Sequence, residues 1–381
     1  MSVDTKLAEE TILRIKERAA KQSERNRAKL KELFGRAGRE GRKPPEDFGD
    51  SSYLYVRSTS ADSGARPLPN GTVFWLSPDI RIRPLTGTGS YTTTLEAGKS
   101  YMVEVHLRNR GDIPVPSAKV ELFLTDPTIG FDTRFATLHG VGSTWVPGVG
   151  SGVVTIPFRV PAAESGHKCL IVRAFSFSPM DLPLDDTALS PPVDRHVAQL
   201  NINIVASSSA MIVPFQLVHL ANFQGQLRFR AATQREILGA GHALFAETEF
   251  IETPRLPLQL MRQAGINHVG GGDTHRLTME NDGRVIRLSS EGDGPSLDDQ
   301  KVHNARMAEA LELIGAGKAK PSEFRDLLRE RRKFATANVV DRFELKLPQI
   351  GVEKGQSMAV HLETVSVFGE TVGGITLALT G

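Results

Sequence analysis

The chain of 381 residues lacks several features that would narrow its function at once. It has one cysteine, Cys169, so no intrachain disulfide can form, and this favours a reducing compartment. No window approaches the roughly 18–20 consecutive apolar residues of a membrane-spanning helix, and the charged N-terminus lacks the apolar core of a secretory signal. These absences predict a cytoplasmic protein without a membrane span, and export by a route without a cleaved signal stays open as an alternative.

Sequence motifs of catalysis are also missing. There is no Gly-x-Ser-x-Gly elbow, and the Gly-rich segment 140–152 is followed by neither the lysine nor the helix of a phosphate-binding loop. Cys169 follows His167 at the start of an apolar run, where burial as a small apolar side chain is favoured over a catalytic thiol. We therefore expect a non-enzymatic protein with no catalytic residues and no cofactor.

Aromatic residues are scarce and turn-forming residues are not. Two Trp and four Tyr stand against 35 Gly and 22 Pro, which indicates many turns between short strands. The net charge of +2 hides a split: residues 1–43 hold 13 Lys/Arg and 7 Asp/Glu, whereas residues 44–381 hold 33 and 37. The acids interleaved in the basic segment, with Phe34 as its single aromatic residue, do not favour nucleic-acid binding.

That basic segment has the composition of a helix. Residues 3–34 contain neither Pro nor Gly and are rich in strong helix formers. We predict a helical arm over residues 1–43, joined by a linker over residues 44–71 to the body. An apolar stripe at helical spacing predicts docking to a protein partner or to a second copy through four residues, Ile12, Ile15, Leu30 and Leu33. A solvated helix explains the same spacing, so both interpretations stay open.

Residues 72–206 change to short runs typical of β-strands. In Ser100–Arg108 (SYMVEVHLR) the alternation puts Met102, Glu104 and His106 on one face and apolar side chains on the other. Turn clusters separate about seven such runs, and no helical pattern lies between them. This spacing predicts a sandwich of two antiparallel sheets.

The segment LEAGKSYMVEVHLRNRGDIPVPSAKVELFLTDP resembles the bacterial CARDB-type immunoglobulin-like domain. Later pieces, GVVTIPFRVP, HKCLIVRAFS and DRHVAQLNINIV, fit the remaining strands of that sandwich, so the resemblance covers roughly residues 77–206. It implies an immunoglobulin-like fold that serves adhesion, spacing or assembly.

Residues 207–381 predict a second, diverged β-sandwich. The turn VEKG before SMAVHLETV repeats the earlier EAGK before SYMVEVHL. A helical hairpin is expected as an insertion over residues 296–334, beginning at a capping box of Ser296 and Asp299. The expected fold class is mainly β, with two immunoglobulin-like antiparallel β-sandwiches, an N-terminal helix and this inserted hairpin.

One polar cluster suggests ligand chemistry. The segment NHVGGGDTHR (267–276) holds His268, Asp273 and His275, and two imidazoles with a carboxylate suit a divalent metal. A strand pair joined by a Gly-rich turn explains the same residues. The function predicted first is a structural or interaction protein that acts as a scaffold or in assembly. The alternative is a binding module for glycan, peptide or divalent metal, and a hydrolase in the second unit is a further one.

Overall fold

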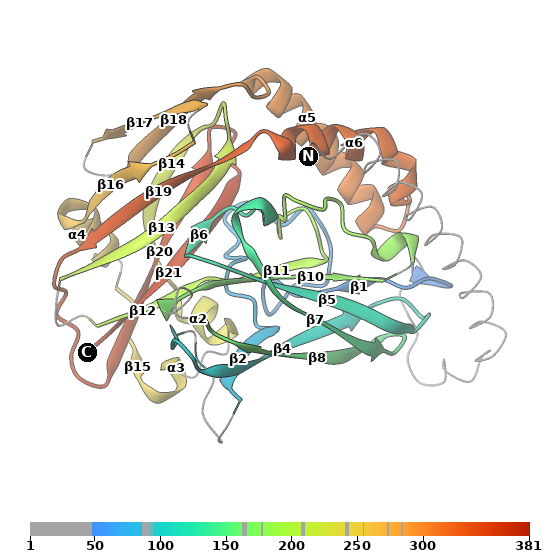
Figure 1. The fold of residues 1–381 in the computed structure, drawn as a ribbon, viewed down its shortest axis with the longest axis horizontal. Coiled ribbons are helices and arrows are strands. Elements are labelled where there is room, and N and C mark those ends of the chain that lie inside the picture. The colour runs from blue at the N-terminus through green and yellow to red at the C-terminus, as the bar shows by residue number, and fades with distance from the viewer. Residues whose placement is uncertain are drawn as a thin grey trace.

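The computed structural model describes residues 48–381 except 86–91, 93, 162–165, 177, 207–209, 241–243, 254, 273 and 283–284. The predicted arm, with Ile12, Ile15, Leu30 and Leu33, lies outside the described residues, and so does Asp273. The described chain is mainly β, as predicted, with a helical layer at one side (Figure 1). None of its helices is long and apolar enough to cross a membrane.

Two four-stranded sheets form the N-terminal part. The first contains β1 (Leu54–Tyr55), β2 (Ile80–Pro84), β4 (Ser100–Asn109) and β8 (Gly150–Arg159), and the second contains β5 (Val115–Thr125), β7 (Thr137–Val146), β10 (Cys169–Phe175) and β11 (Val197–Leu200). A short pair joins β3 (Thr94–Leu95) to β9 (Gly166–His167). Along β4, buried and partly exposed residues alternate without exception, which confirms the predicted faces.

These two sheets share one apolar core. Val103 and Val105 on β4 are fully buried, and they belong to the same cluster as Leu122 on β5 and Leu170 on β10. Each such side chain stabilises the fold by about 1.5–3 kcal/mol when it leaves water. The two sheets therefore form the layers of a sandwich.

Two further sheets form the C-terminal part. One contains β12 (Ile202–Ala206), β21 (Thr371–Thr380), β20 (Gln356–Ser366), β14 (Gln224–Ala231), β18 (Ile286–Gly292) and β17 (His275–Asn281), with β15 (Glu249–Phe250) paired to β20. The other contains β16 (Gly265–Gly270), β19 (Asn338–Leu347), β13 (Met211–Leu220) and β6 (Thr128–Ile129). A second core, with Phe215, Phe343 and Leu362, lies between them.

Two segments differ from their predictions: the strand predicted over residues 197–205 and the linker predicted over residues 44–71. The strand predicted over residues 197–205 divides at Asn201, so that β11 and β12 belong to different sheets. Asn201 is fully buried at this division, and its side-chain amide donates to the carbonyls of Thr128 and Gly374. Within the predicted linker, Tyr53 and Leu54 are buried and form part of the first sandwich.

Helices occupy the region where the sequence predicts a hairpin. They are α5 (Leu297–Gly315) and α6 (Arg325–Thr336), joined by the 3₁₀ helix Pro321–Phe324. The predicted capping box at Ser296 and Asp299 is confirmed, with both reciprocal hydrogen bonds present. Shorter helices are α2 (Gln234–Ala240), α3 (Leu244–Glu247) and α4 (Leu256–Gln263), with 3₁₀ turns at Thr133–Phe135 and Pro179–Asp181.

Candidate metal centre

Asp341 lies on β19, the strand of the second sandwich that has β13 on one side and β16 on the other. Its side chain faces inward, on the same face of the strand as the apolar Phe343 and Leu345, and Asp341 is 0 % exposed. A carboxylate in such a place must find hydrogen-bond donors or a cation, since burying an unpaired charge costs several kcal/mol. Three histidines meet this requirement.

His219 approaches Asp341 from β13. Leu217 is opposite Asp341 in the strand pairing, so His219 lies diagonally across on the same face. Its Nε2 is 2.7 Å from Asp341 Oδ2, and its Nδ1–H donates to the carbonyl of Leu220 at 2.6 Å. That second contact assigns a proton to Nδ1. Nε2 of a neutral His219 would then present a lone pair to a carboxylate oxygen, so either a second proton or a cation must lie between them.

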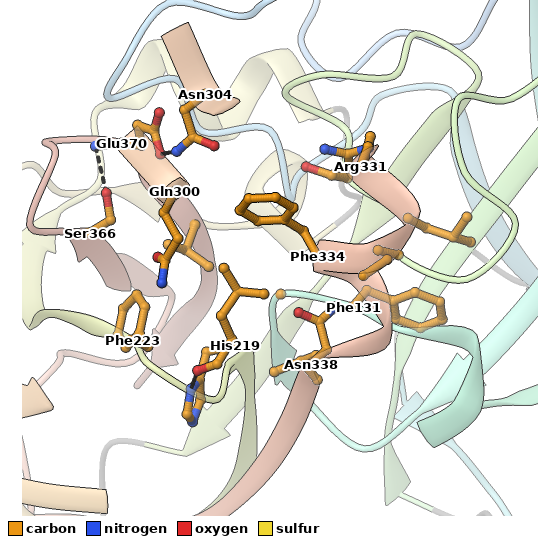
Figure 2. A pocket seen from close by; sticks show the side chains of 18 of the residues that line it. Phe131, His219, Phe223, Gln300, Asn304, Arg331, Phe334, Asn338, Ser366 and Glu370 are labelled. Atoms are coloured by element: carbon orange, nitrogen blue, oxygen red, sulfur yellow. Dashed lines mark hydrogen bonds between the residues drawn. The ribbon is translucent and has the colours of Figure 1, made fainter. Parts of the chain in front are cut away.

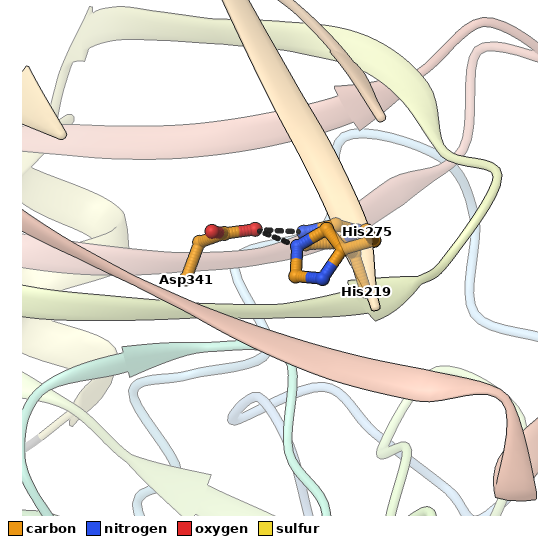
Figure 3. A group of neighbouring side chains, drawn as sticks. All are labelled: His219, His275 and Asp341. Atoms are coloured by element: carbon orange, nitrogen blue, oxygen red, sulfur yellow. Dashed lines mark hydrogen bonds and ion pairs between the residues drawn. The ribbon is translucent and has the colours of Figure 1, made fainter. Parts of the chain in front are cut away.

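The two histidines predicted from the Gly-rich segment complete the cluster. Nε2 of His268 on β16 is 2.7 Å from Asp341 Oδ1, and Nε2 of His275 on β17 is 2.8 Å from Oδ2. The strands β16 and β17 belong to different sheets, so this segment crosses the sandwich and does not form a tight hairpin turn. His219, His275 and Asp341 converge in Figure 3, with side chains almost fully buried.

Gly271 allows that crossing to pass close to the carboxylate. A Cβ at this position would lie 1.9 Å from Asp341 Oδ1, far inside van der Waals contact. The Gly run in the sequence therefore has a steric role: it lets the backbone approach Asp341 while His268 and His275 reach it from either side.

The contacts keep Asp341 ionised. Burial on its own raises the pKa of Asp341, but the hydrogen bonds with His219, His275 and His268 outweigh it and lower the pKa to about 2. A buried carboxylate with imidazole nitrogens around it is a ligand set that divalent transition metals prefer, whereas Mg²⁺ and Ca²⁺ prefer oxygen ligands alone.

The geometry fits a metal with a small adjustment. The ligand atoms of His219, His275 and Asp341 all lie within 4.8 Å of one another. Zinc bonds of about 2.0–2.1 Å would place tetrahedral ligand atoms about 3.3 Å apart, so the present contacts would open by roughly half an ångström. The Nδ1 proton of His219 already has its carbonyl acceptor, as outer-shell partners of metal ligands usually do. Among the described residues, His275 Nδ1 is buried and has no hydrogen-bond partner.

Sequence reasoning found half of this cluster. It named His268 and His275, and it missed His219 and Asp341, which lie 122 residues apart. A signal existed in VVDRFELKL, because alternation places Asp341 on the same face as Phe343 and Leu345. A lone acid on an apolar strand face indicates a buried partner. Which segment of the chain supplies that partner is known only once the strands are packed together.

The thiol considered from the sequence does not join any such site. Cys169 is fully buried, and its sulfur accepts a hydrogen bond from Gln199 at 3.2 Å. Burial raises the pKa of Cys169 to about 12, so the thiol stays protonated and is a poor nucleophile.

No protein-family model matches the chain, and no curated protein sequence matches it. Solved structures with some likeness include the collagen adhesin from S. aureus, at 10% identity over 79% of this chain and 93% of that one, with a TM-score of 0.19. The CupB6 tip adhesin from Pseudomonas aeruginosa is 8% identical over 87% and 97% of the two chains, with a TM-score of 0.16.

A β-D-glucoside glucohydrolase from Trichoderma reesei is 16% identical over 32% of this chain, with a TM-score of 0.18, and this chain spans 17% of its length. TM-scores of this size carry no functional conclusion. The function must be argued from the site itself.

Proposed function

We propose that the chain is a non-enzymatic binding protein whose second sandwich holds one divalent transition metal between His219 Nε2, His275 Nε2 and Asp341 Oδ2. The convergence of these imidazole nitrogens on one buried carboxylate carries the proposal. His268 donates to the other oxygen of Asp341 and orients the carboxylate, a role that commonly tunes metal affinity by 10–100-fold. Asp273, the third ligand predicted from the sequence, lies outside the described residues and stays a prediction.

The metal has a structural role in this proposal. Its ligands come from β13 and β19 in one sheet and from β17 in the facing sheet, so an ion here ties the two layers together. The ligand side chains of His219, His275 and Asp341 are at most 1% exposed, so the ion would be shielded from solvent, and a water molecule would supply the fourth ligand of a tetrahedral centre. A bound ion at a hundred times its dissociation constant stabilises a folded chain by about 2.7 kcal/mol.

Zinc titration of the full chain, after chelator treatment, tests this. We expect one zinc per chain by calorimetry, a raised unfolding temperature, and the visible absorption of tetrahedral cobalt when Co²⁺ replaces zinc. His275→Gln and Asp341→Asn remove one ligand each with little change of volume and should weaken zinc binding by at least tenfold. His106→Gln on β4 is the matched control and should bind like the wild type. Wild-type protein without stoichiometric zinc, or equal affinity in all variants, would contradict the proposal.

An assembly function is the second candidate, because exposed apolar residues lie on β7 and β8, two consecutive strands that belong to different sheets and contact each other. On β7 the side chains of Leu138, Val141 and Trp145 are 50%, 58% and 56% exposed, and Val153 on β8 is 44% exposed. Single exposed apolar residues are ordinary, whereas several on adjoining strands mark an interaction surface. This supports the scaffold prediction. The immunoglobulin-like, CARDB-type modules, the docking arm and the cytoplasmic location are further parts of the proposal.

Sedimentation velocity distinguishes self-association from a monomeric state. Trp145→Ser should shift an assembled wild type toward the monomer without lowering its unfolding temperature. A version lacking residues 1–43 tests the predicted docking through Ile12, Ile15, Leu30 and Leu33 separately. An assembly unchanged by both alterations would rule out this mode of association.

A further inference from the structure

A cavity of about 200 Å³ lies beneath the helical hairpin, where α5 and α6 cover the junction of the two sandwiches (Figure 2). Its walls include the loop after β6, the loop before β11, the turn after β13, the turn between β20 and β21, and the two helices. Arg331 and Phe334 on α6 are only partly buried, so the cavity is reachable from solvent. This volume is below the roughly 300–1,000 Å³ of pockets for drug-sized molecules, so a ligand here must be small.

Arg331 brings a positive charge to this cavity without a counter-ion in contact. Within the described residues it makes no hydrogen bond or ion pair, and its Nε is buried. Burial lowers the pKa of Arg331, and the charges of Asp185 and Asp194 offset this only from beyond contact distance. Its neighbour Arg332, by contrast, pairs with Asp186 at 3.1 Å. A guanidinium so placed favours an anion that enters from outside.

His303 on α5 offers a second polar group in the same cavity. It is 2% exposed, and neither of its ring nitrogens has a hydrogen-bond partner among the described residues. The ring stacks on Phe334 with centroids 4.3 Å apart and planes at 16°, so its orientation is fixed. Glu330 lies 3.9 Å from Nδ1, beyond hydrogen-bond distance. Burial lowers the pKa of His303, so the ring is a neutral donor and acceptor.

The rest of the wall combines apolar side chains with polar ones, among them His219, Gln300 and Asn338. Phe131, Phe223 and Phe334 supply aromatic surface, and Leu189 adds an aliphatic side chain. The acid in the wall, Glu370, accepts a hydrogen bond from Asn304 at 2.6 Å, and burial raises its pKa. The cavity therefore combines one unpaired cation and one unpartnered imidazole with aromatic surface.

We propose that this cavity binds a small organic carboxylate with a compact apolar body. The carboxylate pairs with the Arg331 guanidinium, whose planar fork matches two carboxylate oxygens, and accepts a further hydrogen bond from His303. The apolar body packs against Phe131, Phe223 and Phe334. An inorganic anion satisfies Arg331 but leaves this aromatic surface unfilled, so the cavity selects a carboxylate with a hydrophobic part.

Benzoate is the probe, and benzamide and inorganic phosphate are its controls. Calorimetric titration of the full chain should show benzoate binding at least tenfold tighter than benzamide, which has the same shape without the charge. Arg331→Met should weaken benzoate binding by about ten- to a hundredfold, the usual effect of losing a hydrogen bond to a charged group. His303→Phe keeps the stacking on Phe334 and removes both ring nitrogens. This variant should weaken benzoate binding less than Arg331→Met does.

Arg329→Met on the outer part of α6 is the matched control and should bind benzoate like the wild type. Since Arg331 has no partner in the part of the chain that the structure describes, Arg331→Met should unfold at or above the wild-type temperature, so a loss of binding is not a loss of fold. Asp341 does not line the cavity, which shares only His219 with the metal centre, so Asp341→Asn should retain benzoate binding. Absence of benzoate binding at millimolar concentration, equal binding of benzamide, or an unaffected Arg331→Met variant overturns the proposal. Phosphate binding as tight as benzoate overturns the selection for an organic ligand.

Discussion

Replacing Asp341 by asparagine removes the carboxylate on which three imidazoles converge while keeping the shape of the side chain. The pKa of Asp341 falls from 3.8 to about 2 in the folded protein. Each unit is worth 1.36 kcal/mol, so the ionised carboxylate contributes about 2 kcal/mol to the free energy of unfolding at neutral pH. Because the folded pKa is depressed, this contribution is fully present above about pH 4 and is lost as the pH falls through about 2.

The assay compares urea unfolding of wild type and Asp341→Asn between pH 7 and pH 3, with a chelator present. Trp75 is fully buried against Thr376, so its fluorescence reports loss of the fold. We expect Asp341→Asn to be less stable by about 2 kcal/mol at pH 7, with the difference shrinking below pH 4. The control Asp326→Asn, whose side chain is 93% exposed, should follow the wild type. A difference that is absent at pH 7, or that stays constant down to pH 3, would refute the reasoning.

Three further experiments test the close approach of Gly271 to Asp341, the hydrogen bonds of Asn201 and the burial of Cys169. Gly271→Ala should lower the unfolding temperature and weaken zinc binding, since its Cβ would lie 1.9 Å from Asp341 Oδ1, whereas Gly351→Ala, which has open space, should do neither. Asn201→Ala removes two buried hydrogen bonds and should cost about 2–4 kcal/mol in urea unfolding; a cost below 1 kcal/mol would contradict the role given to this amide. Cys169 should resist a thiol reagent in the folded chain and react at once in urea, so rapid labelling of native protein would contradict its burial.

Local signals predicted the local elements well. The alternation of Ser100–Arg108 and the capping box at Ser296 depend on neighbours within a few residues, and both are found in the structure. The division of the strand at Asn201 was not predictable in this way. Its amide bonds to Thr128 and Gly374, 73 and 173 residues away, and these contacts exist only once the two sandwiches pack together.

The candidate metal centre shows the same limit. His268 and His275 stood out because they are close in the sequence, yet the residue that joins them, Asp341, comes from a strand 66 residues after His275. What the sequence did contain was a conflict: an acid at a position where alternation predicts an apolar side chain. Such conflicts between pattern and residue type concentrate at functional or strained sites. Polar residues on otherwise apolar strand faces are visible in the sequence alone, and Asp341 and His219 are both of this kind.

The protons on His219 decide between the two ways in which this cluster can be stable. Because Nδ1–H donates to the Leu220 carbonyl, Nε2 is the nitrogen left to face Asp341. A proton there makes a buried ion pair, and a metal there makes a coordinate bond, so the two exclude each other. Metal binding must therefore release that proton, and its affinity must rise with pH. A cluster that serves only as an ion pair has no such linkage, and its stability does not respond to zinc.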